Sequence, residues 1–378
     1  MAVEFRYAKR DEYPAISRFL NDHWAKDHIY VRNESLFNWA FHRPSQWPEE
    51  GLSWAVAEDK SELVGILGGI PFSFNQFGKR AQGVWIANYV IRQDYRKGST
   101  ALQLLSMFRR PSFQAVIAFG INPATATIYR VLRGEVLPQI PRHFMVLPEA
   151  VGRMQNLLQI AHPDWSAERI EGLSEAFRLP SLPPAPVEVE EGIPGDWDRK
   201  DWPEIAAATV GASRDSDYLN WRYRQHPCFS YRIVTVRDGS RTGLLVWRLE
   251  TIRRATPEGR VDVDRIGRLV EFLPASPANA EALFAAFVGE LKAADAFGAD
   301  FYGYHGQTQG MLKAMEFNET SVHMDSEGIP SRFQPLDGKG GGIMSALFVQ
   351  DAVSPGRSFE GGCPWYWTKS DSDQDRPN

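Results

Sequence analysis

A tryptophan motif occurs twice in this chain of 378 residues, and this repeat limits the folds that the chain can adopt more than any other feature. The stretch "LFNWAFHRP" covers 36–44, and "YLNWRYRQHP" covers 218–227. Each has an Asn-Trp pair, an aromatic residue two places after the tryptophan and a proline soon afterwards. Trp39 and Trp221 are separated by 221 − 39 = 182 residues. A repeat of such a long period predicts one structural module written twice, with the two tryptophans as packing residues common to both copies.

The segments around the motif agree in their order. The stretches 3–16 and 187–205 each read as a strand, a charged turn and a helix opened by an aromatic-Pro pair, where proline costs little. Strand-turn-strand patterns typical of β-hairpins follow at 52–74 and 229–252. Each copy then continues with strand, helix, strand, helix and a final strand. We predict an α+β (mixed α/β) fold of two modules, each a mixed, mostly antiparallel sheet flanked by helices.

The length and a proline-rich stretch divide the chain. A single hydrophobic core does not grow to 378 residues, so two domains are expected. Five prolines between 178 and 195 mark a linker with a lead-in strand. The predicted division is a first module at 1–177, that linker, a second module at 196–350 and a tail at 351–378. The aromatic stretch "CPWYW" covers 363–367 within this tail, and it predicts that the end of the tail docks on the protein.

Composition excludes several classes of protein. Apolar runs such as Ala115–Phe119 are too short to span a membrane, and the charged N-terminus lacks the apolar core of a secretory signal. Two distant cysteines, Cys228 and Cys363, favour a reducing cytoplasm. A net charge of −5 argues against a general nucleic-acid binder. No zinc signature or nucleophile elbow occurs, so no metal is expected.

Two stretches of the first copy carry a resemblance to a known family. In "VIRQDYRKGSTALQLL" (90–105) a strand runs through a loop into a helix, and backbone N–H groups in such a loop can hold a pyrophosphate. In "GINPATATIYRVLRG" (120–134), Tyr129 follows Asn122 by seven residues. Together they resemble the GCN5-related N-acetyltransferase (GNAT) family, whose acyl-CoA loop reads Q/R-x-x-G-x-G/A. Ser99 replaces the middle glycine of that pattern, and Gly134 stands one place later than is usual in the family.

This resemblance implies an acyl-CoA cosubstrate, either acetyl-CoA or a hydroxyacyl-CoA, and an amine that attacks its thioester. A backbone N–H near Val90 or Ile91 would stabilise the oxyanion, and Tyr129 would be the general acid for the departing thiolate. Asn122 is expected first as a helix cap and second as a CoA contact. The loop residues that would anchor the acyl-CoA are Arg96, Lys97, Gly98, Ser99, Thr100 and Ala101.

The remaining roles are less strongly indicated by the residues. His28 can accept a proton near neutral pH, although a place on a solvated helix face is the more ordinary explanation for it. Asn88 and Tyr89 lie on the third strand, where substrate could be contacted. Glu271 holds the comparable place in the second copy, either as a pocket carboxylate or as an edge-strand charge. That copy has Leu312 where the tyrosine would be and lacks loop glycines, so only the first module is expected to be active.

A narrower resemblance lies in 21–39, in 218–227 and in the last residues, 366–378. These stretches look like tandem GNAT proteins that acylate amino groups of nucleotide-linked sugars for bacterial surface polysaccharide. The expected substrates are therefore an acyl-CoA and a nucleotide-linked amino sugar, with no nucleic acid and no membrane, and a homodimer is allowed. Two alternatives stay open: an aminoacyl-tRNA-dependent transferase of the peptidoglycan-bridge (FemX-like) type, and a non-catalytic scaffold.

Overall fold

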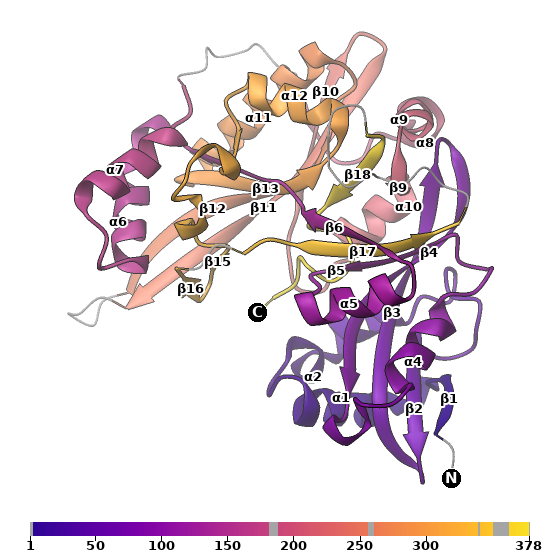
Figure 1. Ribbon diagram of the computed structural model, residues 1–378. Coiled ribbons are helices and arrows are strands. Elements are labelled where there is room, and N and C mark those ends of the chain that lie inside the picture. Colours follow the sequence, from indigo (N-terminus) through magenta and orange to yellow (C-terminus); the bar gives the residue numbers. More distant parts are fainter. Residues whose placement is uncertain (1–2, 181–187, 256–260, 339–340, 351–362, 378) are drawn as a thin grey trace.

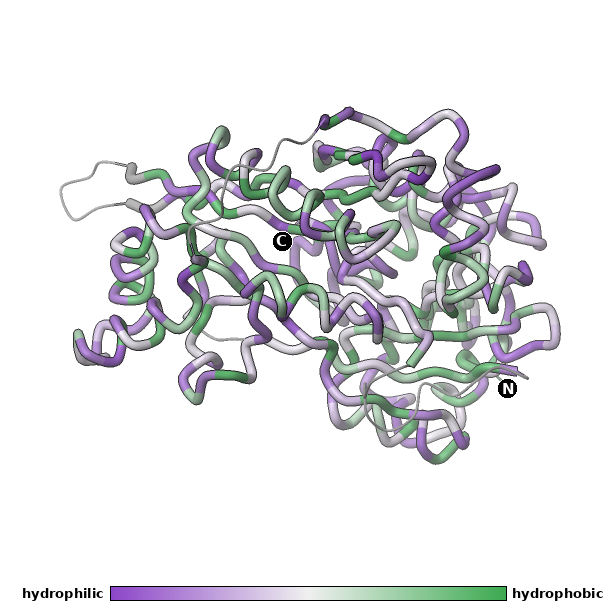
Figure 2. Tube along the Cα trace, turned by 90° about the horizontal axis from the view of Figure 1, so that it is seen from above, coloured by the Kyte–Doolittle hydropathy of each residue, from purple (hydrophilic) through white to green (hydrophobic). Residues whose placement is uncertain are grey.

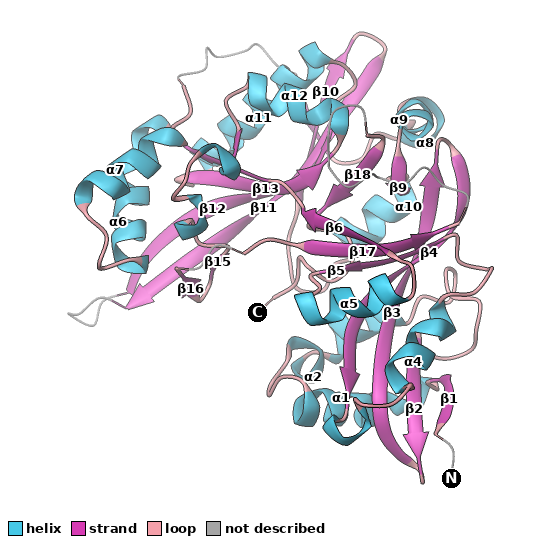
Figure 3. Ribbon diagram, viewed as in Figure 1, coloured by secondary structure: helices cyan, strands magenta, loops and turns pink. Residues whose placement is uncertain are grey.

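The computed structural model describes residues 3–180, 188–255, 261–338, 341–350 and 363–377. Helices flank two large, mostly antiparallel sheets, as the order of sequence patterns predicts, and two short strands between them join both into one 16-stranded sheet (Figure 3). Parts of the predicted linker and tail, 181–187 and 351–362, lie outside the described residues.

The first sheet has the strand order β1-β2-β3-β4-β5-β17-β6, in which β4 and β5 are parallel and the other neighbours antiparallel. Its strands are β1 (Glu4–Tyr7), β2 (Trp54–Asp59), β3 (Glu62–Gln76), β4 (Lys79–Ile91), β5 (Ala115–Phe119), β17 (Met344–Val349) and β6 (Glu135–Gln139). The helices of this half are α1 (Tyr13–His23), α2 (Ile29–Arg32), α3 (Glu34–Phe41), α4 (Thr100–Phe108) and α5 (Pro123–Val131).

The second sheet repeats this arrangement in the order β8-β10-β11-β12-β13-β7-β14, with β12 and β13 as its parallel pair. Its strands are β8 (Val189–Glu191), β10 (Arg232–Asp238), β11 (Arg241–Ala255), β12 (Val261–Leu273), β13 (Gly298–Tyr304), β7 (Arg142–Val146) and β14 (Asn318–Glu319). The helices are α6 (Val151–Ala161), α7 (Ala167–Ala176), α8 (Trp197–Lys200), α9 (Trp202–Ala208), α10 (Ser216–Leu219), α11 (Pro277–Ala293) and α12 (Gly306–Ala314). The repeat predicted from the sequence is therefore present in the strand order.

The two halves exchange one strand each. The strand β7 comes from the first half of the chain but pairs with β13, from Tyr302 with Arg142 to Gly298 with Val146. The strand β17 comes from the second half but lies between β5 and β6 of the first sheet (Figure 1). Each sheet is therefore completed by the other half of the chain. The domain boundaries predicted at 177 and 196 stay predictions. The strand β7 lies before the first boundary and belongs to the second sheet, whereas β17 lies after the second boundary and belongs to the first sheet.

Trp39 and Trp221 meet where the two halves join. Their rings stack with centroids 4.8 Å apart, and each indole N–H donates to the other residue's carbonyl, at 3.1 and 3.3 Å. Such a reciprocal contact is what a repeated residue makes near an approximate twofold axis. The prediction that both tryptophans pack is confirmed, and they pack on each other.

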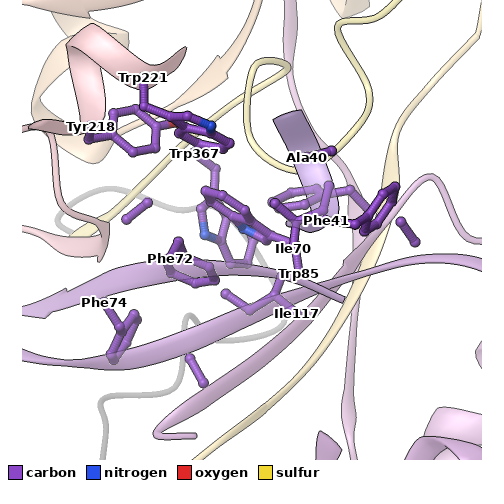
Figure 4. Close-up of a cluster of buried hydrophobic side chains, with 14 of the residues drawn as sticks. Ala40, Phe41, Ile70, Phe72, Phe74, Trp85, Ile117, Tyr218, Trp221 and Trp367 are labelled. Atoms are coloured by element: carbon purple, nitrogen blue, oxygen red, sulfur yellow. The ribbon is translucent and has the colours of Figure 1, made fainter. Parts of the chain in front are cut away.

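The C-terminal residues dock between the halves. The strand β18 (Trp365–Thr368) pairs with β13 and with the short strand β9 (Val210–Ala212), and β9 pairs with β3. Figure 4 shows Trp367 in one hydrophobic cluster with Phe72 and Trp85 of the first sheet and Trp221 of the second half. Hydrophobic residues accordingly occur throughout both halves in Figure 2. We call residues 369–377, which follow β18, the C-terminal segment.

Candidate active site

A cavity of about 430 Å³ opens where β4 and β5 separate, and we call it the acyl cavity. Parallel pairing of the two strands ends at Ile86 with Ala118, whereas β4 continues to Ile91. The space that this leaves is lined by the end of β4, Arg96 and Ala101 near the start of α4, the turn after β5, the first turns of α5, the C-terminal segment and Trp24 after α1. Of the predicted site residues, this cavity collects Asn88, Tyr89, Val90, Ile91, Arg96, Ala101, Asn122 and Tyr129.

A bulge in β4 directs its backbone toward the acyl cavity. The register with β3 shifts between Ala87 and Val90, and Asn88 has a φ of 51°, a left-handed conformation that asparagine tolerates. Beyond the bulge the N–H of Arg92 donates to Val64 on β3, at 2.9 Å. Because successive residues of a strand point their N–H groups to opposite edges, Ile91 directs its N–H away from β3, toward the edge where β5 has separated. Of the two predicted oxyanion donors, this geometry favours Ile91.

The predicted acyl-CoA loop leads directly into α4. The guanidinium of Arg96 donates to the carbonyl of Ile91 at 3.0 Å, and the helix begins at Thr100. Ser99 adopts φ −84° and ψ 0°, so the serine that replaces the family's glycine fits without backbone strain. Its hydroxyl accepts from Gln103 at 2.7 Å and makes no cap bond to the helix backbone. The first N–H groups of a helix have no partner within it, so the start of α4 can receive an anion.

Four loop residues stay outside the lining of the acyl cavity, namely Lys97, Gly98, Ser99 and Thr100. Thr100 is buried under the helix, whereas Gly98 borders open space, since the nearest atom to an added Cβ is the Tyr95 carbonyl at 3.9 Å. These positions lie between Arg96 and Ala101 in the chain, and both of those residues line the cavity. A pyrophosphate there would meet backbone donors and the charges of Arg96 and Lys97.

Asn122 and Tyr129 lie on α5 as the motif predicts. Asn122 caps the helix, its side-chain oxygen accepting from the N–H of Thr125 at 2.9 Å, and it also lines the acyl cavity. Tyr129 is 0% exposed, its ring stacks on Phe348 of β17 at 5.5 Å, and none of the described residues hydrogen-bonds its hydroxyl. Burial raises the pKa of Tyr129, so the phenol keeps its proton. An unpaired buried hydroxyl in the cavity wall is suited to receive a ligand atom.

The sequence did not identify three residues of the C-terminal segment that close the acyl cavity, namely Asp373, Gln374 and Arg376. Asp373 is 6% exposed, and its carboxylate accepts from Gln374 at 2.9 Å and pairs with Arg376. The side chain of Gln374 also donates to the carbonyl of Phe119 at the end of β5, at 3.3 Å. The only signal in the sequence is the aromatic stretch before a charged end, which predicts docking but no site.

His28 lies in a neighbouring cavity of about 580 Å³, which we call the cationic cavity. It caps α2, its Nδ1 accepting from the N–H of Tyr30 at 3.3 Å. Burial, with a smaller effect of Arg376, lowers the pKa of His28 to about 4, so the imidazole is neutral at pH 7 and a weak proton acceptor. The two cavities share Gln374 and Arg376 as a common wall.

Glu271 does not line the acyl cavity, and its carboxylate is fully buried in the second module. It is 0% exposed, pairs with Arg214 at 2.9 Å and accepts hydrogen bonds from Tyr223 and Tyr366, both at 2.6 Å. Tyr366 also receives the N–H of Phe272, at 3.0 Å. Its hydroxyl therefore occupies part of the opening between β12 and β13 that corresponds to the acyl cavity, and a smaller cavity of about 200 Å³ remains beside it. Glu271 belongs to this buried cluster, and we assign it no catalytic role.

Among the described residues, no His, Cys, Asp and Glu side chains form a group of three or more that could hold a metal ion. None of the helices that the described residues form combines the length and apolar character needed to cross a membrane.

Comparison with known proteins depends on structure alone, because no protein-family model and no curated protein matches the chain. A GCN5-related N-acetyltransferase from Anabaena variabilis aligns with a TM-score of 0.51 at 12% identity, covering 92% of this chain and 73% of that one. One from Kribbella flavida gives 0.50 at 14%, covering 93% and 71%. Saccharomyces cerevisiae N-myristoyltransferase with bound myristoyl-CoA gives 0.52 at 12%, covering 94% and 82%. At these identities the likeness shows the fold, and over 92% of this chain that fold is the one of the GCN5-related N-acetyltransferases.

Proposed function

We propose that the protein is an N-acyltransferase that moves an acyl group from acyl-CoA directly to an amine. The observation that carries this proposal is the acyl cavity itself, which brings together a separated strand pair, the start of α4 and the unpaired hydroxyl of Tyr129. Its walls fit the ligand: apolar side chains such as Ile86 and Ile128 suit a pantetheine chain, and the helix start suits a pyrophosphate.

The residues then divide the chemistry among them. The start of α4, with Arg96 and Lys97, would hold the phosphates. The N–H of Ile91 would donate to the thioester oxygen as it becomes an oxyanion. The amine attacks the thioester carbon, the C–N bond forms and the C–S bond breaks. Tyr129 would then give its proton to the departing sulfur and regain one from the amine nitrogen.

Binding of acyl-CoA is tested with a charge placed at the helix start. Ser99→Asp is expected to weaken the binding of CoA and acetyl-CoA by about 10-fold or more, since a carboxylate would repel the pyrophosphate. Aspartate is a favourable N-cap residue, so the helix itself is not destabilised by the change. Isothermal titration measures the affinity.

The matched control is Ser166→Asp, which makes the same change at the N-cap of α7, where the Ser166 hydroxyl accepts from the N–H of Arg169. It is expected to leave CoA affinity unchanged. No CoA binding by the wild-type protein at high micromolar concentration would remove the enzyme proposal altogether.

We further propose that the acceptor is a nucleotide-linked amino sugar that enters from the cationic cavity. Seven basic side chains line this cavity against three acidic ones, namely Lys26, Arg32, Arg248, Arg268, Arg332, Lys369 and Arg376 against Asp27, Glu250 and Asp375. An acceptor that carries a diphosphate matches this excess of positive charge. Because the two cavities adjoin at Gln374 and Arg376, an acceptor whose diphosphate lies in the cationic cavity would have its sugar next to the acyl cavity.

Lys369 provides the test of this acceptor. It is partly buried, makes no ion pair with any described residue and lies over the Tyr302 ring at 4.9 Å. Lys369→Met is expected to raise the KM for dTDP- or UDP-amino sugars roughly 10- to 100-fold, the size of a lost charged hydrogen bond. Burial, then Arg268, lowers the pKa of Lys369 to about 8, so affinity should fall as the pH rises through that value.

Lys292→Met removes a lysine from an exposed ion pair with Glu149 and serves as the control, with no change in KM expected. The measurement is steady-state kinetics across a panel of acyl-CoAs and amino sugars. Equal turnover of amino sugars with and without a nucleotide would contradict the proposed acceptor.

A further inference from the structure

The proposed reaction needs a group that takes a proton from the acceptor, because amines arrive as ammonium ions near neutral pH. Neither His28 nor Glu271, the two candidates from the sequence that could accept this proton, lies in the acyl cavity: His28 lines the cationic cavity, and Glu271 is buried in the second module against Arg214, Tyr223 and Tyr366. The proton acceptor must therefore be sought among the residues that surround the reacting atoms.

Asp373 is the one carboxylate among the described residues that line the acyl cavity. Its place is fixed by its neighbours on the C-terminal segment. Gln374 bonds both to Asp373 and to the carbonyl of Phe119, so the segment is attached to the end of β5 where the cavity opens. The fit is close, since a Cβ added to Gly120 would come within 2.6 Å of the Gln374 side chain.

Charged and titratable groups face Asp373 from two elements. Arg376 on the same segment pairs with one carboxylate oxygen. His28 at the start of α2 and Tyr30 within it lie near enough to interact with it electrostatically. His28 is neutral at pH 7 and burial raises the pKa of Tyr30, so Arg376 is the charged group of these three neighbours.

We propose that Asp373 binds the ammonium group of the acceptor and takes its first proton. This rests on the proposed acyl transfer. The carboxylate accepts one proton from R–NH₃⁺, and the neutral amine that remains attacks the thioester carbon. After the C–N bond forms and the C–S bond breaks, a second proton leaves nitrogen and reaches sulfur through Tyr129. The products are the amide, CoA as the free thiol and one proton, which Asp373 releases to solvent.

The experiment compares Asp373→Asn with the wild-type protein, using acetyl-CoA and a dTDP-linked aminodideoxyhexose as probes. Asparagine keeps the shape and can still accept from Gln374 and Arg376, but it cannot take a proton. We expect turnover to fall on the order of 100-fold and the acidic limb of the kcat/KM profile to disappear. Acetyl-CoA affinity by isothermal titration should stay unchanged.

A binding measurement separates recognition from catalysis. The wild-type protein should prefer the amino sugar over the dTDP-sugar that has a hydroxyl at that carbon, and Asp373→Asn should lose this preference. Asp373→Glu should restore part of the activity. Asp217→Asn, which neutralises an exposed carboxylate elsewhere, should match the wild type in every measurement.

The outcomes distinguish this inference from the function on which it rests. If wild-type protein binds no acetyl-CoA, the acyltransferase proposal fails. If acetyl-CoA binds but Asp373→Asn keeps its turnover and pH profile, or if the wild type binds both sugars equally, the assignment of Asp373 alone is overturned. Loss of acetyl-CoA binding in Asp373→Asn would also overturn it, because the residue would then act on the acyl donor.

Discussion

Tyr129→Phe is expected to lower the turnover number by a factor on the order of 10² to 10⁴ and to leave acyl-CoA affinity nearly unchanged. The change removes one oxygen atom and keeps the ring that stacks on Phe348. That oxygen is buried and has no hydrogen-bond partner among the described residues, so no contact that stabilises the fold is lost. Because burial raises its pKa, the phenol is protonated when the thiolate leaves. Pre-steady-state kinetics with chemistry limiting would measure the effect.

Tyr89→Phe is the matched comparison in the same cavity. The Tyr89 hydroxyl donates to the carbonyl of Ala101 in the first turn of α4. Its loss should therefore disturb the end of α4 that we propose to bind phosphate, and weaken acyl-CoA affinity more than it lowers turnover. An unchanged turnover number in Tyr129→Phe would exclude this tyrosine as the acid.

Arg214→Met is expected to reduce the free energy of unfolding by about 3–5 kcal/mol. Arg214 is 0% exposed and joins two carboxylates, Glu271 at 2.9 Å and Asp371 at 2.9 and 3.0 Å. Without the guanidinium, two acidic groups would stay buried beside each other without their common partner. Asp371 belongs to the C-terminal segment, so the change should also loosen the wall between the two cavities. Denaturant titration measures the stability, and hydrogen exchange over 369–377 measures the loosening.

Arg178→Met supplies the control for this stability effect. Arg178 is about half exposed and pairs with Glu175 at 3.6 Å. Such surface pairs contribute little, so the expected change is within about 1 kcal/mol. If the two variants lost the same stability, the buried arginine would not hold the segment in the way we describe.

Local patterns predicted the elements of the fold well. Hairpin turns, helix caps and strand alternation depend on neighbouring residues, and the repeated Asn-Trp pair made the order of elements readable in both copies. The exchange of β7 and β17 could not be read in this way. A strand such as Met344–Val349 has the same alternation whichever sheet it joins, and the choice depends on contacts with residues far away in the sequence, such as Phe119.

The residues of the candidate site show the same difference between local motifs, which the sequence predicts, and long-range contacts, which it does not. The loop 96–101 and the spacing from Asn122 to Tyr129 lie on consecutive elements of one module, so their sequence motif is visible. The bulge near Asn88 became apparent only in the structure. His28 and Glu271 were single residues without such a pattern, and the structure places both outside the acyl cavity. Asp373 was missed because it reaches the cavity from the other end of the chain.

The amino-acid sequence by itself determined two modules, their order of strands and helices, and which module carries the acyl-CoA motif, because these follow from periodicity and from residues close together in the chain. The tertiary structure decided which strands complete each sheet, where the Tyr366 hydroxyl lies in the second module and which carboxylate lines the acyl cavity. These outcomes depend on long-range packing and on the pairing of buried charges such as Arg214 with Asp371, which are set only when distant segments meet.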